Sequence, residues 1–176
     1  MATPGAGTTR PVEGEYAPYY GRYISLVPDG DIVGTLEQQF ESTLTLLRGI
    51  DESRANHRYA PDKWSIKELV GHLIDAERIF AYRALCFARK DNTPIAGFEQ
   101  DDYVAVADFD KRTFTDLISE FEYVRKSNVL LFRSFDPEAL SSRGTASDSE
   151  ISVRALLYSI AGHELHHMQV LKSRYV

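Results

Sequence analysis

The chain lacks several features that would assign it to a specialised class of protein. It has a single cysteine in 176 residues, which excludes an internal disulfide and is typical of a protein from a reducing compartment. It has no apolar run of the roughly 18 residues that a membrane-spanning helix needs, and residues 1–10 contain no apolar segment of the kind found in secretory signals. We therefore expect a soluble, cytoplasmic protein without a membrane partner.

Basic charge is also scarce. The chain has 20 Lys and Arg against 26 Asp and Glu, a formal net charge of −6, whereas proteins that bind nucleic acid depend on clustered basic side chains. We therefore expect no nucleic-acid partner. Hydrophobic residues make up 43% of the chain and charged residues 26%, which is typical of a globular protein. The length predicts one domain, at residues 13–176, after a disordered tail rich in small residues at 1–12.

Apolar residues recur at three- and four-residue steps in four long segments, as they do on one face of an α-helix. These segments cover about residues 31–50, 65–90, 113–136 and 152–171. Two of them begin with capping signals, from Ser65 to Glu68 and from Thr113 to Asp116. Helices with one apolar face bury it best against one another, so the sequence predicts an all-α four-helix bundle.

The segments between and before these helices give weaker indications of their secondary structure. The connection between the second and third helices, residues 91–112, is long for a compact domain, and residues 99–107 could form a short helix within it. No stretch alternates apolar and polar residues with hairpin turns, so we expect no β-sheet. Residues 16–23 include four tyrosines. We interpret them as an extended arm packed on the bundle, with ligand binding as the alternative.

The sequence contains only five histidines, and three of them fall in the run His163-Glu-Leu-His166-His167. His163 and His167 are four residues apart, so they share one face of a helix, about 6 Å apart along its axis. They lie on the apolar stripe, and His72 lies on the inward stripe of the second helix. Three inward imidazoles on two helices match a metal site with an open position, and we therefore expect the second and fourth helices to be adjacent. We expect His57 to be exposed, and His166 to be either a surface residue or a partner of a ligand.

The same run matches the H-E-x-x-H pattern of zinc peptidases, in which the glutamate, here Glu164, is the general base. Those enzymes normally take a third ligand downstream, but none of the nine residues after His167 is His, Asp or Glu. No sheet is expected that could hold a peptide by strand addition. We therefore interpret the match as a by-product of the histidine spacing.

Three other residues are candidates for a role near the histidines. Cys86 lies fourteen residues beyond His72, about 21 Å along one helix, so we interpret it as a core residue and not as a source of thiol. Asn128 interrupts the apolar stripe of the third helix; a core asparagine bonded to the backbone is the favoured interpretation, and a partner of a metal ligand is the alternative. Asp75, one turn from His72, could orient an imidazole.

Several segments resemble the DinB/YfiT-like proteins, and together they extend over about residues 15–175. The run Tyr-Ala-Pro-Asp-Lys-Trp-Ser-Ile-Lys-Glu at 59–68, with the Gly71-His72-Leu73 that follows, looks like the start of the second helix in that family. The segment at 162–167 looks like their last helix. Residues 77–83 and Thr93-Pro94 are also similar.

This resemblance implies a four-helix bundle, often a homodimer, with a three-histidine site for a divalent metal. Carried over to this chain, the ligands would be His72, His163 and His167. Better-understood relatives are thiol-dependent transferases and isomerases that use bacillithiol, mycothiol or glutathione. The resemblance thus implies an enzyme acting on a small molecule, with zinc or nickel as the metal and a low-molecular-weight thiol as co-substrate.

The chemistry of such a site leaves more than one function open. Three neutral imidazoles leave the +2 charge of the ion uncompensated, which favours an anionic fourth ligand. A bound thiolate would attack an epoxide, a halide or an activated double bond, whereas a bound hydroxide would hydrolyse a small substrate. A non-catalytic metal- or ligand-binding protein is a further alternative, and a structural dimerisation module is the weakest.

Overall fold

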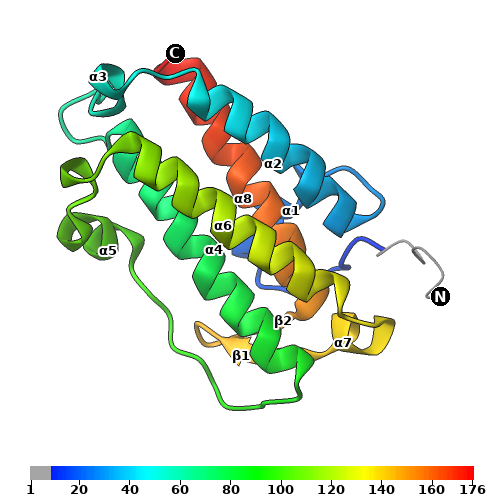
Figure 1. The fold of residues 1–176 in the computed structure, drawn as a ribbon. Coiled ribbons are helices and arrows are strands. Elements are labelled where there is room, and N and C mark those ends of the chain that lie inside the picture. The colour runs from blue at the N-terminus through cyan, green and yellow to red at the C-terminus, as the bar shows by residue number, and fades with distance from the viewer. Residues whose placement is uncertain (1–8) are drawn as a thin grey trace.

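Four long helices lie side by side along most of their length in the computed structural model, which describes residues 9–176 (Figure 1). They are α2 (Ile32–Arg48), α4 (Ile66–Ala88), α6 (Phe114–Arg133) and α8 (Val153–Arg174). The shorter helices are α1 (Pro18–Ile24), α3 (Glu52–Ala55), α5 (Gln100–Ala107) and α7 (Pro137–Ser141), with a 3-10 turn, η1, at Phe109–Lys111. The strands are β1 (Arg143–Ala146) and β2 (Ser149–Ser152).

The four long helices form a closed ring of contacts. Helix α4 packs against α6 and α8, and α2 packs against the same two helices from the opposite corner. The predicted adjacency of the second and fourth long helices, α4 and α8, is therefore confirmed. Leucine, isoleucine, valine, alanine and phenylalanine side chains fill the space between the helices in two buried clusters. No helix in residues 9–176 combines the length and the hydropathy needed to cross a bilayer.

The local signals in the sequence set the helix starts. Ser65 accepts a hydrogen bond from the Glu68 backbone N–H while Glu68 accepts one from the Ser65 backbone, so the predicted capping box is present. Thr113 caps α6 by accepting from the Asp116 N–H, and Ser152 caps α8 in the same way. The short helix expected within the long connection is also confirmed, as α5.

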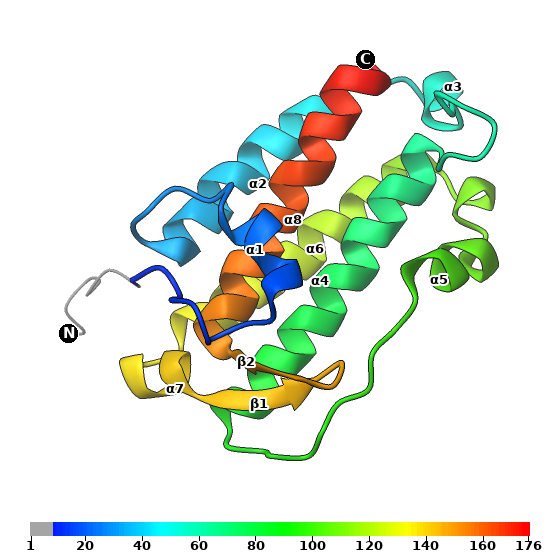
Figure 2. The ribbon, with the colours of Figure 1, turned by 180° about the vertical axis from the view of Figure 1, so that it is seen from behind.

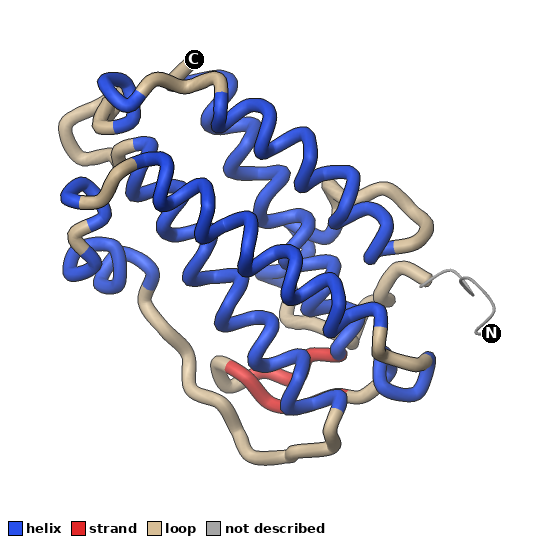
Figure 3. Tube along the Cα trace, viewed as in Figure 1, coloured by secondary structure: helices blue, strands red, loops and turns tan. Residues whose placement is uncertain are grey.

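The structure contradicts the expectation of no β-sheet. Strands β1 and β2 pair in an antiparallel hairpin with Arg143 opposite Ser152, shown in red in Figure 3. Ser147 and Asp148 make the turn, both with positive φ, at 51° and 58°. The hairpin was missed because each strand has only four residues, too few for alternation to show, and because the turn uses Ser-Asp where Asn-Gly is the usual signal.

The tyrosine-rich segment is a helix and not an extended arm. Pro18 occupies the first turn of α1, where its fixed φ suits a helix start. Helix α1 lies against α8, as Figure 2 shows from behind. The approach is close because Gly162 has no side chain: a Cβ there would lie 2.0 Å from the Tyr23 carbonyl oxygen. The apolar residues of so short a helix are too few to reveal its period.

The expected disordered tail covers residues 1–12, of which 1–8 lie outside the described residues. Residues 9–12 do not fit that expectation, because Arg10 fastens them to the body. Its Nη1 donates to the Ile24 carbonyl at 2.7 Å, and its Nε pairs with Asp29 at 2.7 Å. A composition rich in small residues did not reveal these contacts of a single arginine.

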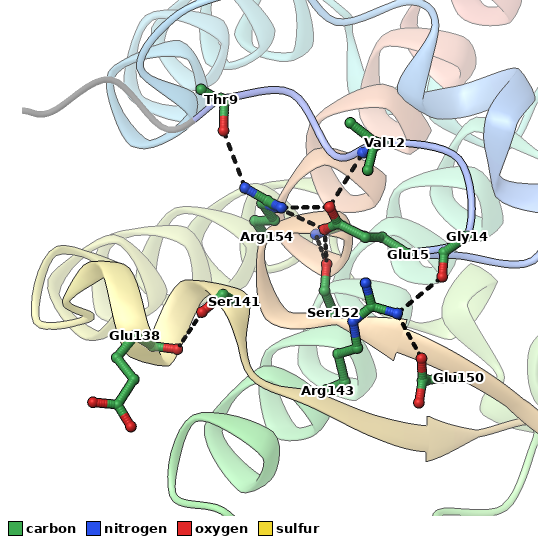
Figure 4. A network of polar contacts seen from close by, with 11 residues as sticks. Thr9, Val12, Gly14, Glu15, Glu138, Ser141, Arg143, Glu150, Ser152 and Arg154 are labelled. Atoms are coloured by element: carbon green, nitrogen blue, oxygen red, sulfur yellow. Dashed lines mark hydrogen bonds and ion pairs between the residues drawn. The ribbon is translucent and has the colours of Figure 1, made fainter.

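A second set of polar contacts ties the N-terminal segment to the start of α8 (Figure 4). Glu15 is buried and accepts hydrogen bonds from the Ser152 hydroxyl at 2.8 Å and from Arg154 Nε at 2.6 Å. Burial alone would raise the pKa of Glu15, but the bonds from Arg154, Ser152 and the Val12 N–H outweigh it, so the pKa is lowered. The carboxylate therefore stays ionised and holds the N-terminal segment against the start of α8.

A buried ionic network joins all four long helices at their centre. Arg125 of α6 binds Glu77 of α4 with two parallel hydrogen bonds of 2.8 Å and Glu164 of α8 with one of 2.7 Å. Its Nη1 donates to the Leu36 carbonyl of α2 at 3.1 Å, and Thr43 of α2 donates to Glu164. Arg125 is 1% exposed. Both carboxylates hold its pKa far above the ordinary value despite the opposing effect of burial.

We expect Arg125→Met to lower the free energy of unfolding by about 3–5 kcal/mol, because it leaves two carboxylates buried without their counter-charge. Arg133→Met is the matched control: Arg133 lies two turns further along α6 and pairs with Glu37 at the surface, so its loss should cost about 0–1 kcal/mol. Urea unfolding measures both.

The triple variant Arg125→Met/Glu77→Gln/Glu164→Gln should regain a large part of the stability that Arg125→Met loses, because the unpaired charges are then gone. Equal losses in Arg125→Met and Arg133→Met would contradict the central role of the network.

Candidate metal centre

Three imidazoles converge at one point between α4 and α8. The Nε2 atom of His163 lies 2.9 Å from Nε2 of His72 and 3.1 Å from Nε2 of His167. All three ligand atoms lie within 4.8 Å of one another. A tetrahedral ion with metal–nitrogen bonds of about 2.0–2.1 Å would hold its ligand nitrogens roughly 3.3 Å apart. The structure therefore brings together the three residues that the sequence singled out, and two of the three nitrogen pairs are close to the spacing that one ion needs.

The helices place these side chains without any irregular backbone. His163 and His167 are one turn apart on α8, and His72 faces them from α4, which is adjacent to α8 along its length. His72 and His163 are buried and His167 is half-buried. Ligands on regular helices leave little freedom for the site to change shape.

Burial also fixes the protonation state of the site. It lowers the pKa of His72 to about 4 and, together with repulsion from His72, His166 and Arg22, lowers the pKa of His167 to about 3. The pKa of His163 is well below its usual range, again mainly because of burial. All three imidazoles are therefore neutral at pH 7, which is the form that binds a metal.

Aromatic rings enclose the three imidazoles. The Trp64 ring lies 4.7 Å from the His72 ring and stacks 6.3 Å from the His167 ring, measured between centroids. Tyr23 of α1 meets the His163 ring edge-on at 5.3 Å. Neither aromatic residue was predicted to lie beside the histidines, although ligand binding was the alternative for the tyrosines at 16–23. Trp64 stands in the family-like segment at 59–68, eight residues before His72, and that position was the available signal.

A cavity of about 580 Å³ opens beside His72 and His163. One face of α4 forms its floor, with Ala76, Phe80 and Arg83 following His72 along the helix. Three peripheral segments supply the walls: residues 17–23, which include most of α1, residues 97–101 and the hairpin turn at 147–149. A cavity of this size suits a small organic molecule, since ligand pockets are typically about 300–1,000 Å³.

Comparison with known proteins agrees with this architecture. The family model of the DinB superfamily matches residues 35–171. The chain belongs to the DinB superfamily. Its structure is similar to that of YfiT from Bacillus subtilis, with a TM-score of 0.65 and 14% identity over 95% of this chain and 94% of that one. YfiT is described as a probable metal-dependent hydrolase with an unusual four-helix bundle topology.

A second DinB-like protein from Bacillus subtilis, YjoA, has a TM-score of 0.59 and 22% identity over 80% of this chain and 86% of that one. At these identities the likeness shows the fold alone. Comparison with curated proteins gives no match. The family resemblance and the predicted four-helix bundle are both confirmed for this DinB protein.

Glu164 does not hydrogen-bond to the three imidazoles. Its carboxylate accepts hydrogen bonds from Arg125 and Thr43, about a quarter-turn round α8 from His163, and it is 1% exposed. It therefore cannot serve as the general base of the H-E-x-x-H pattern, which agrees with the interpretation of that match as a by-product of spacing. Its role in this DinB protein is to hold the bundle core beneath the histidines.

The other candidates lie apart from the three imidazoles. Asn128 donates to Glu77 at 3.1 Å, so it belongs to the core network, bonded to a carboxylate and not to the backbone. Asp75 makes no hydrogen bond to an imidazole in residues 9–176. Burial raises its pKa, and the charges that act on it are those of Arg78, Glu120 and Arg112. Asp75 therefore does not orient a ligand.

The remaining sequence candidates lie where they were expected or beside the site. His57 is exposed, and Cys86 packs against the bundle core. His166 is exposed, with its ring 5.6 Å from Tyr23 and 5.2 Å from the His167 ring. It is a surface residue that touches a metal-ligand candidate, and it is outside the convergent set.

We expect His72→Ala, His163→Ala and His167→Ala each to lower the divalent metal content from one ion per chain to near zero, because two ligands hold an ion poorly. His57→Ala should have no effect and His166→Ala a smaller one. Plasma mass spectrometry after purification without a histidine tag measures the metal, and circular dichroism checks that every variant is folded. Full occupancy in His72→Ala would contradict a site shared by two helices.

We also expect the metal-free protein to lose stability as the pH falls from about 6.5 towards 4. Each site histidine has a folded-state pKa below its unfolded value of about 6.5, so the unfolded chain takes up protons first. Above about pH 6.5 neither state is protonated and this contribution to stability is fully present.

Urea unfolding in EDTA at pH 7 and pH 5 measures this effect. The difference between the two pH values should be roughly 5 kcal/mol larger in the wild type than in the variant that replaces all three histidines by alanine, because each histidine contributes about 2 kcal/mol. Other groups that titrate, such as Glu15, are common to both proteins and cancel. Equal differences would show that the imidazoles titrate normally in the folded protein.

Proposed function

We propose that this DinB protein binds one divalent transition metal ion, zinc or nickel, through Nε2 of His72, His163 and His167. We further propose that it is a metal-dependent enzyme that transfers a low-molecular-weight thiol to a small electrophile. The observation that carries the proposal is the convergence of three neutral imidazole nitrogens at one end of a cavity of about 580 Å³.

The chemistry of the donor set supports the thiol. With three neutral ligands the ion keeps its +2 charge and would hold a thiol in its thiolate form, which is the nucleophile. The residues of the chain do the rest. Trp64, Tyr23 and Phe80 surround the imidazoles with apolar rings and limit the access of water. The cavity beside His72 and His163 holds the electrophile against the thiol.

The position of Glu164 favours transfer over hydrolysis. Hydrolytic zinc enzymes with this motif use its glutamate as a general base, and here that glutamate is bound to Arg125. No carboxylate in residues 9–176 hydrogen-bonds to any of the three imidazoles. Attack by a thiolate needs no such base, because the thiol has lost its proton on binding.

Hydrolysis of a small substrate is the second candidate, because YfiT is described as a probable metal-dependent hydrolase. A metal- or ligand-binding role without catalysis is the third. The cytoplasmic location and the absence of nucleic-acid or membrane partners stay predictions, as does the homodimer, which analytical ultracentrifugation at micromolar concentration would test.

The test of the proposed function is turnover of a panel of electrophiles. Metal-loaded protein is incubated with glutathione, bacillithiol or mycothiol and an epoxide, an alkyl halide or an activated alkene, and thioether products are measured by mass spectrometry. We expect product formation that needs both thiol and metal and that falls at least about 100-fold in His163→Ala but not in His57→Ala.

Each outcome of this assay separates the candidates. Ester or amide hydrolysis without any thiol would replace the transferase by the hydrolase. Metal binding at one ion per chain without turnover of any substrate would favour the binding protein.

A further inference from the structure

A buried arginine without a carboxylate partner lines the same cavity as the histidines. Arg83 of α4 is 1% exposed, and its Nη2 donates to the Ala96 carbonyl at 3.0 Å and to the Ser147 hydroxyl at 3.1 Å. Its Nε is buried and has no hydrogen-bond partner. Nη1 makes no hydrogen bond either within residues 9–176. Two of its three nitrogens are therefore free to bind something else.

The unpaired charge of Arg83 is unusual within this molecule. Arg125 is equally buried and is matched by two carboxylates, whereas the partners of Arg83 are two neutral oxygens and the Phe80 ring, 5.8 Å from its guanidinium carbon. A guanidinium cannot escape the cost of burial by losing its proton at pH 7, so a buried one is normally paired with an anion. An anion is therefore the partner that this site lacks.

Helix geometry aims Arg83 at the cavity that the histidines share. Arg83 follows His72 by eleven residues, which is three turns and returns to the same face of α4 within about 20°, with a rise of about 16 Å. Side chains on a helix lean towards its N-terminus, so that of Arg83 reaches back towards His72. Ala76 and Phe80 lie between them on the cavity floor, and the small side chain of Ala76 leaves room above it.

The charges at the mouth of the cavity are negative, opposite in sign to that of Arg83. Glu99, Asp101 and Asp148 line it, but all three are exposed, and water screens their field. Arg83 is the sole Lys or Arg among the described residues that line the cavity, and it lies at the inner wall. A buried charge is screened far less than these rim carboxylates, so an anion that reaches Arg83 should gain more than it loses at the rim.

We propose that the cavity takes an elongated small molecule that carries a terminal oxyanion, such as a carboxylate, which binds Arg83 through the N–H groups of Nη1. The other end of the molecule reaches the three histidines. That metal-bound end rests on the proposed function, whereas the Arg83 end does not depend on it. The substrate class of this DinB protein is therefore a carboxylic acid with its reactive group, such as a thiol, at the far end of the carbon chain, and not a neutral molecule.

The experiment compares mercaptoalkanoic acids, HS-(CH₂)n-COO⁻, with the mercaptoalkanols of the same chain length, HS-(CH₂)n-OH. Both are titrated into cobalt-loaded protein. Calorimetry gives the affinity, and the thiolate-to-cobalt absorption band shows that sulfur, and not the carboxylate, is at the metal. At the chain length that spans the cavity we expect the acid to bind about tenfold or more tightly than the alcohol.

Variants of Arg83 assign that preference. In Arg83→Gln the ratio of acid to alcohol affinity should fall to about one while the affinity of the alcohol is unchanged. Arg83→Lys keeps the charge but loses the planar fork, so part of the preference should remain. Arg89→Gln is the matched control, because Arg89 lies near the same end of α4 but is exposed and does not line the cavity. If Arg83→Gln fails to fold, the comparison of wild type with Arg83→Lys carries the test.

The outcomes distinguish this inference from the proposed function. Equal binding of acid and alcohol, or tighter binding of the alcohol, with a normal thiolate band overturns the anion site and leaves the metal site intact. If no thiol produces the band, the thiol function fails, and metal-free protein then decides the anion site with hexanoate and hexanol. Binding of hexanoate that Arg83→Gln abolishes supports the site, and equal binding of the two probes overturns it.

Discussion

The contact on which the rest of this structure depends is that of Arg125 with Glu77 and Glu164. One guanidinium reaches two carboxylates and a backbone carbonyl, and these partners come from the other three long helices. Ion pairs buried in this way are poor sources of net stability, but they tolerate only one relative position of the helices. Glu164 is the residue next to His163, so the contact that fixes the rotation of α8 also fixes the direction of its histidines.

The same network sets the electrostatic environment of the metal centre. Two carboxylates and one guanidinium leave a formal charge of −1 in the core, and His163 shares a small internal space with all three groups. An ion held by neutral imidazoles brings a charge of +2 into a region of low dielectric constant, where distant charges act strongly. The carboxylates therefore favour a cation above them without contacting it. Burial keeps the imidazoles neutral until it arrives.

Sequence patterns predicted the long helices, in which apolar spacing repeats over several turns, and missed elements too short to show a period. The four long helices were evident because each has several turns of apolar residues, and the capping residues Ser65 and Thr113 marked the starts of two of them. The hairpin and α1 escaped because elements of four to seven residues are too short to show a period. The proximity of His72 to His163 was predicted because both are inward on helices. The adjacency of α4 and α8 was inferred from that shared site, since no helix pattern by itself shows which helices are neighbours.

Side-chain roles were harder to predict than positions. Glu164 and Asn128 were candidates for a role near the site, yet Glu164 binds Arg125 and Asn128 binds Glu77. No spacing rule links residues of three helices. No role at the site was predicted for Arg83 or Trp64, because arginine is ordinarily a surface residue and tryptophan an ordinary core residue. The place of Arg83 at the cavity depends on how α4 packs against the hairpin, and that of Trp64 on how the segment before α4 packs. Both are properties of tertiary packing.

The histidines and the walls of the cavity belong to different parts of the fold. The histidines stand on the rigid faces of α4 and α8, whereas much of the cavity wall is built from α1, the 97–101 segment and the turn of the hairpin, which join the bundle at its edge. Short peripheral segments accept changes of sequence and length far more readily than packed helices do. In a lineage with this fold, changes in these segments would reshape the cavity while the three histidines stay in place. Sequence divergence confined to them would then mark a change in the molecule that the cavity admits.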